Sequence, residues 1–308
     1  MVGEPERCAA CGAADLIPHM KVAGEVGAQG MIPTTKQFGK ALGDIVRCPA
    51  CGHMQLDRFP SEAELNAAYA EAASDDYLAE EAGQRASFAS VLRRIERFCS
   101  AGAILDVGCW VGFLLAEARE RGWRECVGVE PSSFASRYAR ERLGLDVLDE
   151  DLLAAELPKA HFDVAVMGDV LEHLAQPGEA LERIASLLKP GGLIALTLPD
   201  AGSRIARLLG PRWWSVLPTH VHYFTRTSAV TMLERHGYQP LYVGTDPRSF
   251  TVRYYLDKGS GYLPGLSRRL IATAEALGVA ERIWTPDFRD RMLLLARRPD
   301  PLLQPRVI

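Results

Sequence analysis

The segment from residue 103 to residue 122, AILDVGCWVGFLLAEARERG, constrains the fold of this chain more than any other segment. Its apolar first part predicts a buried strand, and the helical spacing of apolar residues from Leu114 onward predicts a helix directly after it. Between the two, Gly108 and Gly112 allow a sharp turn and the close approach of a ligand to the backbone. Backbone N–H groups at the start of the helix would donate hydrogen bonds to that ligand. The segment therefore predicts a strand, loop and helix that bind a nucleotide-like molecule.

The polar residues near this loop narrow the class of ligand. The loop has neither the GxGxxG pattern of hydride-transfer cofactors nor the GK[ST] ending of a phosphate-binding loop. Asp106 lies two residues before the first glycine, where it would repel a pyrophosphate but attract an ammonium group. The next apolar strand, CVGVE, ends in Glu130, where a carboxylate can accept hydrogen bonds from ribose hydroxyls. These two acids predict a ligand that carries both an amine and a ribose.

Five motifs, ILDVGCWVG, VGVEPS, DEDLL, FDVAVMGDVLEHL and LLKPGGLIALTLP, resemble those of the class I S-adenosylmethionine-dependent methyltransferases. The resemblance is strongest to the bacterial group that acts on small molecules and sugars, and it covers about residues 101–199. It implies an α/β fold with a Rossmann-like, seven-stranded sheet and S-adenosylmethionine as cofactor. Trp110 stands where the family often has a glycine, so the shape of the loop departs from the family pattern. A tight strand-to-helix turn without a ligand is the alternative interpretation.

The resemblance also implies which residues contact the cofactor. Asp151 and Leu152 match the position that recognises the adenine amine, although Asp149 and Glu150 beside them are alternatives. The residues after the fourth strand would line the methionine moiety. The implied cofactor-binding set is Asp106, Gly108, Cys109, Gly112, Glu130, Pro131, Asp151, Leu152, Gly168 and Asp169.

Two CxxC pairs near the N-terminus predict a metal site. CAACG and CPACG contain Cys8, Cys11, Cys48 and Cys51, and two such turns can bring four thiolates to the corners of a tetrahedron around a structural zinc ion. Free thiols or a redox pair are alternatives, and His53 is a substitute ligand if one cysteine does not bind. The total of seven cysteines is odd, which argues against a disulfide framework. The arrangement is similar to the N-terminal zinc module of the same methyltransferase group.

A segment rich in aromatic residues and histidine follows the predicted core. RWWSVLPTHVHYFTRTS spans residues 212–228 and is similar to a segment of the bacterial sugar C-methyltransferases that ends His-x-x-Tyr-Phe-Ser/Thr. That match makes His220 the candidate general base, a task that suits an imidazole. Their glutamate before this histidine is Thr219 here, which departs from the family pattern. His173 and His222 are the other candidate catalytic residues, and histidines that only fix an aromatic loop are the alternative.

Composition limits the classes of partner. The 308 residues leave room for a large domain and a smaller module, and the net charge of −4 gives no overall basic footprint for nucleic acid. The residues MVGEPERCAACG contain no apolar signal segment, and no apolar run of about eighteen residues suggests a membrane span. We therefore expect a cytoplasmic protein that acts on a small molecule or sugar and has no membrane or nucleic-acid partner.

The order of the motifs suggests five regions. We expect a zinc module over 1–60, a helical linker or lid over 61–100, the cofactor-binding core over 101–200, a cap with the closing strands over 201–300, and a tail over 301–308. Tyr69 and Tyr77 of the linker are candidate pocket residues, and packing of the linker helix is the alternative. The apolar helix PGLSRRLIATAEALG within the cap is predicted to act as a lid or an oligomer contact.

The sequence thus predicts transfer of a methyl group from S-adenosylmethionine to a sugar, glycan or secondary metabolite, assisted by histidine. One alternative is an RNA base methyltransferase with a zinc module, but the first sixty residues contain only six Lys and Arg side chains. The other is a protein that binds S-adenosylmethionine without turnover; Trp110 favours it and the acids at 106, 130 and 151 oppose it.

Overall fold

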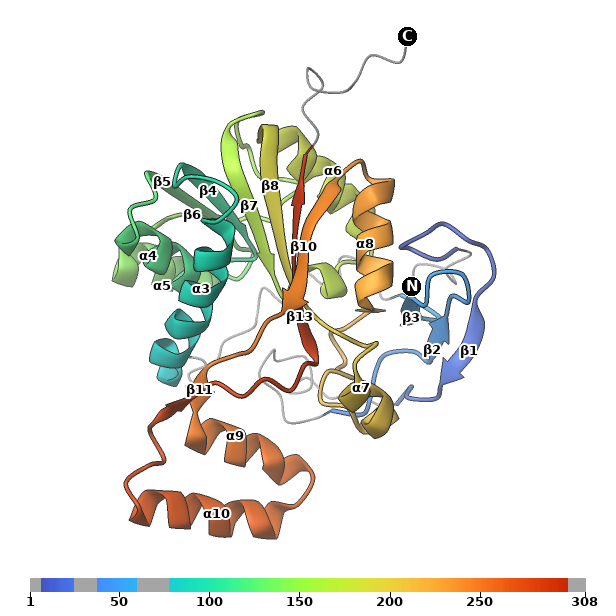
Figure 1. Cartoon of the computed structure of the whole chain (residues 1–308), viewed down its shortest axis with the longest axis vertical. Helices are drawn as coiled ribbons and strands as arrows, with labels where there is room; N and C mark the ends of the chain where they lie inside the picture. The colour runs from blue at the N-terminus through green and yellow to red at the C-terminus, as the bar shows by residue number, and fades with distance from the viewer. Residues whose placement is uncertain (1–6, 25–37, 60–77, 299–308) are drawn as a thin grey trace.

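A mixed sheet of seven strands lies at the centre of the computed structural model, which describes residues 7–24, 38–59 and 78–298 (Figure 1). In the order of the sheet the strands are β10 (Gln239–Thr245), β13 (Arg291–Arg297), β8 (Leu188–Pro199), β7 (Phe162–Gly168), β4 (Ala103–Val107), β5 (Glu125–Val129) and β6 (Asp146–Leu148). The strands β4 to β8 pair in parallel, whereas β13 pairs antiparallel with both β8 and β10. This confirms the predicted α/β fold and the closing antiparallel pair.

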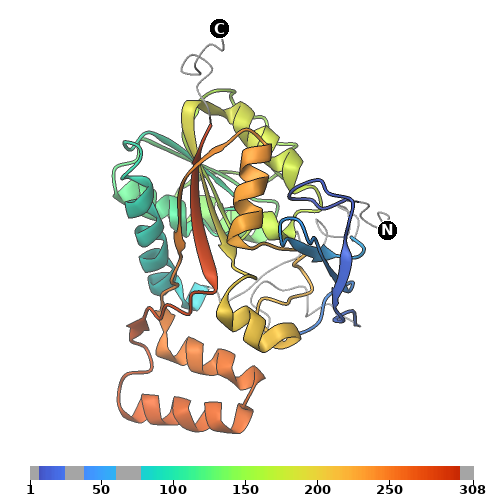
Figure 2. The same cartoon turned by 45° about the vertical axis from the view of Figure 1, so that its right-hand side comes forward.

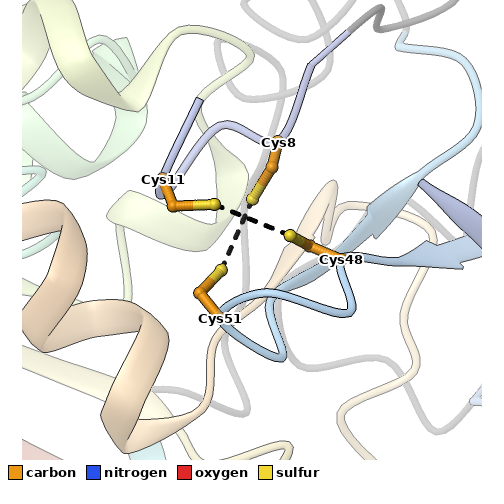
Figure 3. A group of neighbouring side chains, drawn as sticks. All are labelled: Cys8, Cys11, Cys48 and Cys51. Carbon is orange, nitrogen blue, oxygen red and sulfur yellow. Dashed lines mark hydrogen bonds between the residues drawn. The ribbon is translucent and has the colours of Figure 1, made fainter. Parts of the chain in front are cut away.

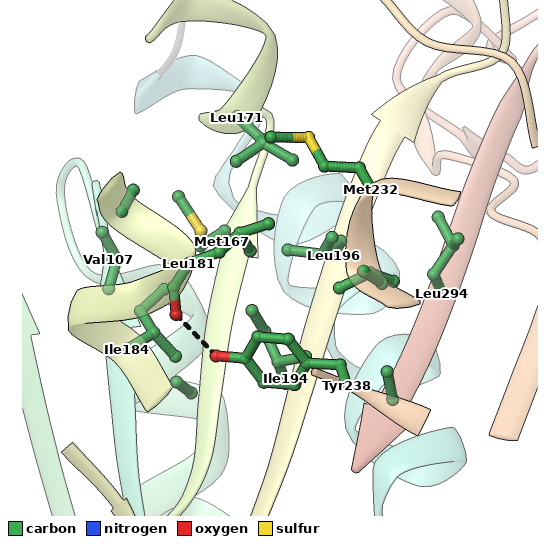
Figure 4. Packing of buried hydrophobic residues seen from close by; sticks show 14 of the residues in the cluster. Val107, Met167, Leu171, Leu181, Ile184, Ile194, Leu196, Met232, Tyr238 and Leu294 are labelled. Carbon is green, nitrogen blue, oxygen red and sulfur yellow. Dashed lines mark hydrogen bonds between the residues drawn. The ribbon is translucent and has the colours of Figure 1, made fainter. Parts of the chain in front are cut away.

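Helices cover both faces of this sheet, because alternate residues of each buried strand point to opposite sides. One face packs against α3 (Glu81–Ile95), α4 (Phe113–Glu120) and α5 (Ser133–Leu143). The other packs against α6 (Pro177–Leu187) and α8 (Arg226–Arg235). Figure 4 shows this second layer, in which the Tyr238 hydroxyl donates to the Leu181 carbonyl at 2.8 Å. The two layers fix the sheet on which the site is built.

The KPGG sequence after α6 differs from the prediction. We expected it to be a turn between the helix and the fifth core strand, but β8 begins at Leu188 and includes it. The pairing of β8 with β7 is nevertheless irregular at these glycines. Phe162 pairs with Leu188, but Val164, two residues on, pairs with Leu193. Gly191 has a φ of 76°, a conformation that glycine adopts without strain. The chain thus turns within the strand.

A second, smaller sheet contains the N-terminal residues and one strand from much later in the chain. Its order is β1 (Ile17–Met20), β2 (Ile45–Arg47), β3 (Met54–Leu56) and β9 (His222–Tyr223). β9 pairs antiparallel with β3, with Met54 opposite Tyr223 and Gln55 opposite His222. Figure 2 shows this sheet beside α8. The predicted zinc module is therefore completed by residues from beyond the core.

The predicted cap forms two parts. α7 (Arg204–Leu209) and a 3₁₀ turn, η3 (Gly210–Arg212), precede β9. The later part is a helical hairpin, seen below the sheet in Figure 1: β11 (Phe250–Thr251), α9 (Val252–Lys258), the 3₁₀ turn η4 (Gly259–Gly261), α10 (Pro264–Ala276) and β12 (Ile283–Trp284). The helix expected in this insert is thus confirmed as α10. Tyr69, Tyr77 and the tail expected over 301–308 lie outside the described residues.

Among the helices that the structure describes, none has the length and apolar character needed to cross a bilayer.

Candidate active site

A cavity of about 800 Å³ lies at the edge of the sheet where its parallel strands end. Its wall contains residues from the ends of β4, β5, β7 and β8, from the segment before β9 and from the helical hairpin. Carboxyl ends of parallel strands are where open α/β sheets bind ligands, since loops there diverge and leave a crevice. The sequence-predicted residues in its wall are Asp106, Gly108, Cys109, Glu130, Pro131, Asp151, Leu152, Gly168, Asp169, His173 and His220. Gly112 and His222 are not in its wall.

The loop after β4 is fixed by its own hydrogen bonds. The N–H groups of Gly108 and Cys109 donate to the Val129 carbonyl at 2.8 and 3.2 Å, and the Trp110 N–H donates to Glu130 Oε2 at 2.8 Å. We expected unpaired N–H groups at the start of the helix that follows; these three N–H groups precede that helix and are used within the protein.

Trp110 occupies a backbone conformation that is unusual for a large side chain. Its φ of 48° lies in the left-handed region, which is costly for a residue with a bulky Cβ substituent. The indole lines the cavity and packs near Phe134 at a ring-centroid distance of 6.4 Å. Trp110 lines a cavity of about 800 Å³, so the tryptophan does not fill it.

Asp106 and Glu130 lie at the ends of neighbouring parallel strands and are 4% exposed each. Burial raises the pKa of both carboxyls, that of Glu130 to about 7 and that of Asp106 well above its usual range with Glu130 adding to the effect. Glu130 also accepts the Ser132 N–H on Oε1 at 2.8 Å, which holds the carboxylate in place. Two buried carboxyl groups with raised pKa values are typical of a site that binds a hydrogen-bond donor or a cation.

The structure distinguishes Asp151 from its acidic neighbours. Asp151 and Leu152 line the cavity, whereas Asp149 lies 3.8 Å from Arg140 and is not in the wall. Asp151 Oδ1 accepts the Leu153 N–H at 2.7 Å, which orients the carboxylate at the start of a turn. Asp151 is therefore the acid of this run that lies at the cavity.

Two arginines that sequence reasoning missed enter the wall of the cavity. Arg291 begins β13 opposite Pro199, so the antiparallel strand delivers it to the edge where the parallel strands end. Both Arg291 and Arg248 form ion pairs with Asp169, the latter at 2.8 Å. Burial opposes ionisation of Asp169, but the two guanidiniums outweigh it and lower the pKa. Asp169, predicted to contact cofactor, is therefore held by protein cations. The sequence signal that could have indicated Arg248 is the Asp-Pro-Arg run at residues 246–248, directly after a strand.

His173 and His220 meet because two distant segments run side by side. His173 ends the 3₁₀ turn η2 (Leu171–His173), and its Nδ1 bonds the Thr219 carbonyl at 2.8 Å. The Val221 N–H donates to the Glu172 carbonyl at 2.9 Å, which extends the pairing. The two imidazoles form an edge-to-face contact at 4.6 Å, and burial lowers the pKa of each. Both residues line the cavity.

His222 lies elsewhere. Its Nδ1 is 3.2 Å from Nε2 of His53, and its ring packs near Phe59 and Phe224. It is 1% exposed and is separated from the cavity wall, although His220 precedes it by only two residues. Strand β9 begins at His222 and pairs with β3, which holds His222 against the cysteine module, whereas His220 lies before the strand begins.

The four cysteines of the CxxC pairs converge (Figure 3). Cys8 Sγ lies 3.6 Å from Cys51 Sγ, and Cys11 Sγ lies 3.6 Å from Cys48 Sγ. All four sulfurs lie within 4.8 Å of one another. Thiolates bound to zinc at about 2.3 Å in a tetrahedron are about 3.8 Å apart. The cluster therefore fits a four-thiolate zinc site, a donor set that closes the coordination sphere.

This fold defines an α/β protein with a cavity at the carboxyl ends of its parallel strands, and the cavity wall holds buried acids from two strand ends and a histidine pair. The family model described as "Methyltransferase domain" matches residues 78–243. The chain therefore belongs to this methyltransferase family.

Similar proteins are known from several bacteria. A ubiquinone biosynthesis O-methyltransferase of Nitrobacter winogradskyi is 34% identical over 149 residues, which cover 45% of this chain and 56% of the relative. An uncharacterized methyltransferase of Mycobacterium tuberculosis is 35% identical over 97 residues, 30% of this chain and 48% of the relative. The chain thus spans about half the length of these curated relatives. A crystal structure of an S-adenosylmethionine-dependent methyltransferase from Mesorhizobium loti aligns with a TM-score of 0.45 and 19% identity, over 68% of this chain and 98% of that chain.

Proposed function

We propose that this chain transfers a methyl group from S-adenosylmethionine to a small-molecule acceptor. The observation that carries the proposal is the convergence of Asp106 and Glu130 at one part of a cavity whose wall also holds His173 and His220. Asp106 suits the ammonium of the methionine moiety, because opposite charges attract strongly at a buried site. Glu130 suits the ribose, because a carboxylate accepts hydrogen bonds from two hydroxyls. Asp151 and Leu152 suit the adenine.

Methyl transfer from a sulfonium needs alignment and exclusion of water more than it needs new charge on the protein. The hydrogen-bonded loop after β4 and the buried carboxylates would hold the cofactor in one position. The helical hairpin supplies part of the wall through Tyr254 and Tyr255, which separates the reacting atoms from solvent. These features are those of a site organised for in-line displacement.

The acceptor that we propose carries a hydroxyl on a ring. Aromatic side chains concentrate in the wall of the cavity, and such faces stack on aromatic rings and on the apolar faces of sugars. They are Trp110, Trp214, Tyr254, Tyr255, Trp284 and Phe288. A phenol, a sugar or a glycan fits this wall, and the similarity to ubiquinone biosynthesis O-methyltransferases supports oxygen as the methylated atom. His173 and His220 are the groups that we assign to activation of that hydroxyl.

We also propose that Cys8, Cys11, Cys48 and Cys51 bind a structural zinc ion. The support is the fit of their sulfur separations to a tetrahedral site and the position of β9, which joins the module to the segment that contains His220. The ion would hold this segment in place and take no part in the reaction, because four protein ligands leave no open position.

Calorimetry and a turnover assay test the proposal together. S-adenosylmethionine should bind with a dissociation constant in the micromolar range. Glu130→Ala should weaken binding at least about tenfold, which corresponds to a loss of about 1.4 kcal/mol of binding free energy. Release of S-adenosylhomocysteine should then be measured with a panel of phenols, nucleotide sugars and glycans. Absence of cofactor binding would overturn the proposal. Binding without turnover on any acceptor, RNA included, would favour a binding protein that has lost activity.

A further inference from the structure

A second set of metal-ligand side chains lies in the wall of the cavity. Glu172, His173 and His220 each offer one ligand atom, and these atoms lie within 4.8 Å of one another. Ligands on one divalent cation, at about 2.1 Å from it, are about 3 to 4 Å apart. The three side chains therefore need to move by about an ångström or less to share an ion. They come from η2 and from the segment before β9.

Glu172 has the features of a ligand without its ion. The side chain is buried, with a residue exposure of 1%, and neither carboxylate oxygen has a hydrogen-bond partner among the described residues. A buried carboxylate without a donor is costly, and native proteins rarely leave one in that state. Glu172 is one of the residues that line the cavity, so a ligand bound in the cavity is the available partner for its carboxylate.

The hydrogen bonds of the two histidines indicate which ring nitrogen of each carries the proton and which carries the lone pair. A carbonyl only accepts, so the bond to the Thr219 carbonyl places the proton of His173 on Nδ1 and leaves the lone pair on Nε2. His220 bonds the Ser215 backbone, and its Nδ1 has no hydrogen-bond partner within the described part of the chain. Its proton is therefore on Nε2 and its lone pair on Nδ1. A backbone acceptor that fixes the tautomer is the usual support of a metal-binding histidine.

The charges nearby favour a cation at this position and not an anion. Arg248 and Arg291 are both paired with Asp169, and both also lie near Asp246, at 3.2 and 3.9 Å. The two guanidiniums are thus balanced by two carboxylates. Glu172 has no hydrogen-bonded cation among the described residues, so a divalent ion bound beside it would stabilise its ionised form.

We propose that Glu172, His173 and His220 form a binding site for one divalent cation of the Mn²⁺, Fe²⁺ or Zn²⁺ class. Two imidazoles and a carboxylate suit these ions, and three protein ligands leave positions open to water or to an acceptor oxygen. A cation there lowers the pKa of a bound hydroxyl. If the proposed function holds, the two histidines then assist methyl transfer as ligands of this ion. The site itself stands independently of that function.

Manganese binding to the zinc-loaded protein tests the site. Mn²⁺ prefers oxygen and nitrogen ligands, whereas thiolates select zinc, so Mn²⁺ added after one equivalent of zinc reports on the second site. Electron paramagnetic resonance of free Mn²⁺ measures the bound fraction. We expect one equivalent to bind to the unaltered protein. Glu172→Gln and His220→Asn should each weaken binding at least tenfold, and His161→Asn, a surface histidine paired with Glu125, should leave it unchanged.

Folding of the variants is measured separately. Glu172→Gln removes a buried charge and keeps the volume, so its metal-free melting temperature should equal or exceed that of the unaltered protein. It should lose the increase in melting temperature that Mn²⁺ gives the unaltered protein. The proposal is overturned if the zinc-loaded protein binds no Mn²⁺, or if both ligand variants bind it as tightly as His161→Asn. Cofactor binding, measured by calorimetry without Mn²⁺, shows independently whether the proposed function fails.

Discussion

The Nε2 atom of His53 lies 3.2 Å from Nδ1 of His222, and this contact between two buried rings joins the cysteine module to the segment that carries His220. The pairing of β3 with β9 reinforces the connection. The position of His220 in the cavity therefore depends on a module whose cysteines are more than 160 residues away in the sequence.

Removal of zinc should loosen this connection. We expect Cys48→Ser, or chelation, to lower the free energy of unfolding by about 3 kcal/mol or more, because a bound structural ion stabilises the folded form. Hydrogen exchange should increase in β2, β3 and β9 and stay low in β4 and β7. Cys126→Ser, outside the cluster, is the matched control. Unchanged exchange in β9 after verified zinc loss would contradict the connection.

His222 should be a stability residue. Replacement of its fully enclosed ring in His222→Ala should cost about 2 to 4 kcal/mol of unfolding free energy through lost packing. The dissociation constant for S-adenosylmethionine should stay within about twofold, since the side chain is outside the cavity wall. Urea denaturation and calorimetry measure the two quantities. Normal stability combined with lost turnover would instead restore His222 to the catalytic site, as first expected from the sequence.

Cofactor affinity should increase with pH near neutrality. Burial raises the pKa of Glu130 to about 7, so below that pH the carboxyl is protonated and accepts ribose hydrogen bonds poorly. As pH rises through about 7 the group ionises, and the binding of S-adenosylhomocysteine should tighten. Calorimetry from pH 6 to pH 8 measures this change. Glu130→Gln, which cannot ionise, should bind more weakly and show a flatter dependence; an equal dependence in both proteins would assign it to another group.

Gly112 should tolerate no side chain. Its φ is 83°, and a Cβ there would meet Leu145 Cδ1 at 2.5 Å. We expect Gly112→Ala to cost about 2 to 4 kcal/mol of stability, from backbone strain together with overpacking. Gly144→Ala is the matched control, because its φ is 61° but a Cβ there meets nothing within 4 Å. The control should cost about 1 kcal/mol. Equal melting temperatures for the two variants would show that the contact with Leu145 relaxes freely.

The charged cluster in the wall of the cavity should show strong coupling. The Asp246 side chain is fully buried, and Arg291→Met removes one of its two guanidinium neighbours. The loss should be about 3 kcal/mol, since a buried charge without its partner is costly. Asp246→Asn in the Arg291→Met background should recover part of that loss. A double-mutant cycle by urea denaturation measures the coupling, and additive losses would argue against it.

The family resemblance of the motifs implied the seven-stranded sheet, and local pattern was sufficient to predict the strand ends that meet at the cavity. Acids such as Asp106 and Glu130 follow apolar strands that alternate with helices, and parallel connections bring the carboxyl ends of such strands to one edge of a sheet. The CxxC spacing likewise predicted which four sulfurs would meet. These features depend on neighbours in the sequence, so the sequence alone determined them.

Only the tertiary structure decided which histidines face the cavity and which charges surround them. His220 and His222 differ by two residues, yet the pairing of β9 with β3 holds His222 beside His53, whereas His220 packs against His173 in the wall. Glu172 gains its significance from the segment that packs against η2, and Arg291 from the antiparallel placement of β13. Each of these depends on contacts between distant segments, and periodicity within a segment carries no information about its partner.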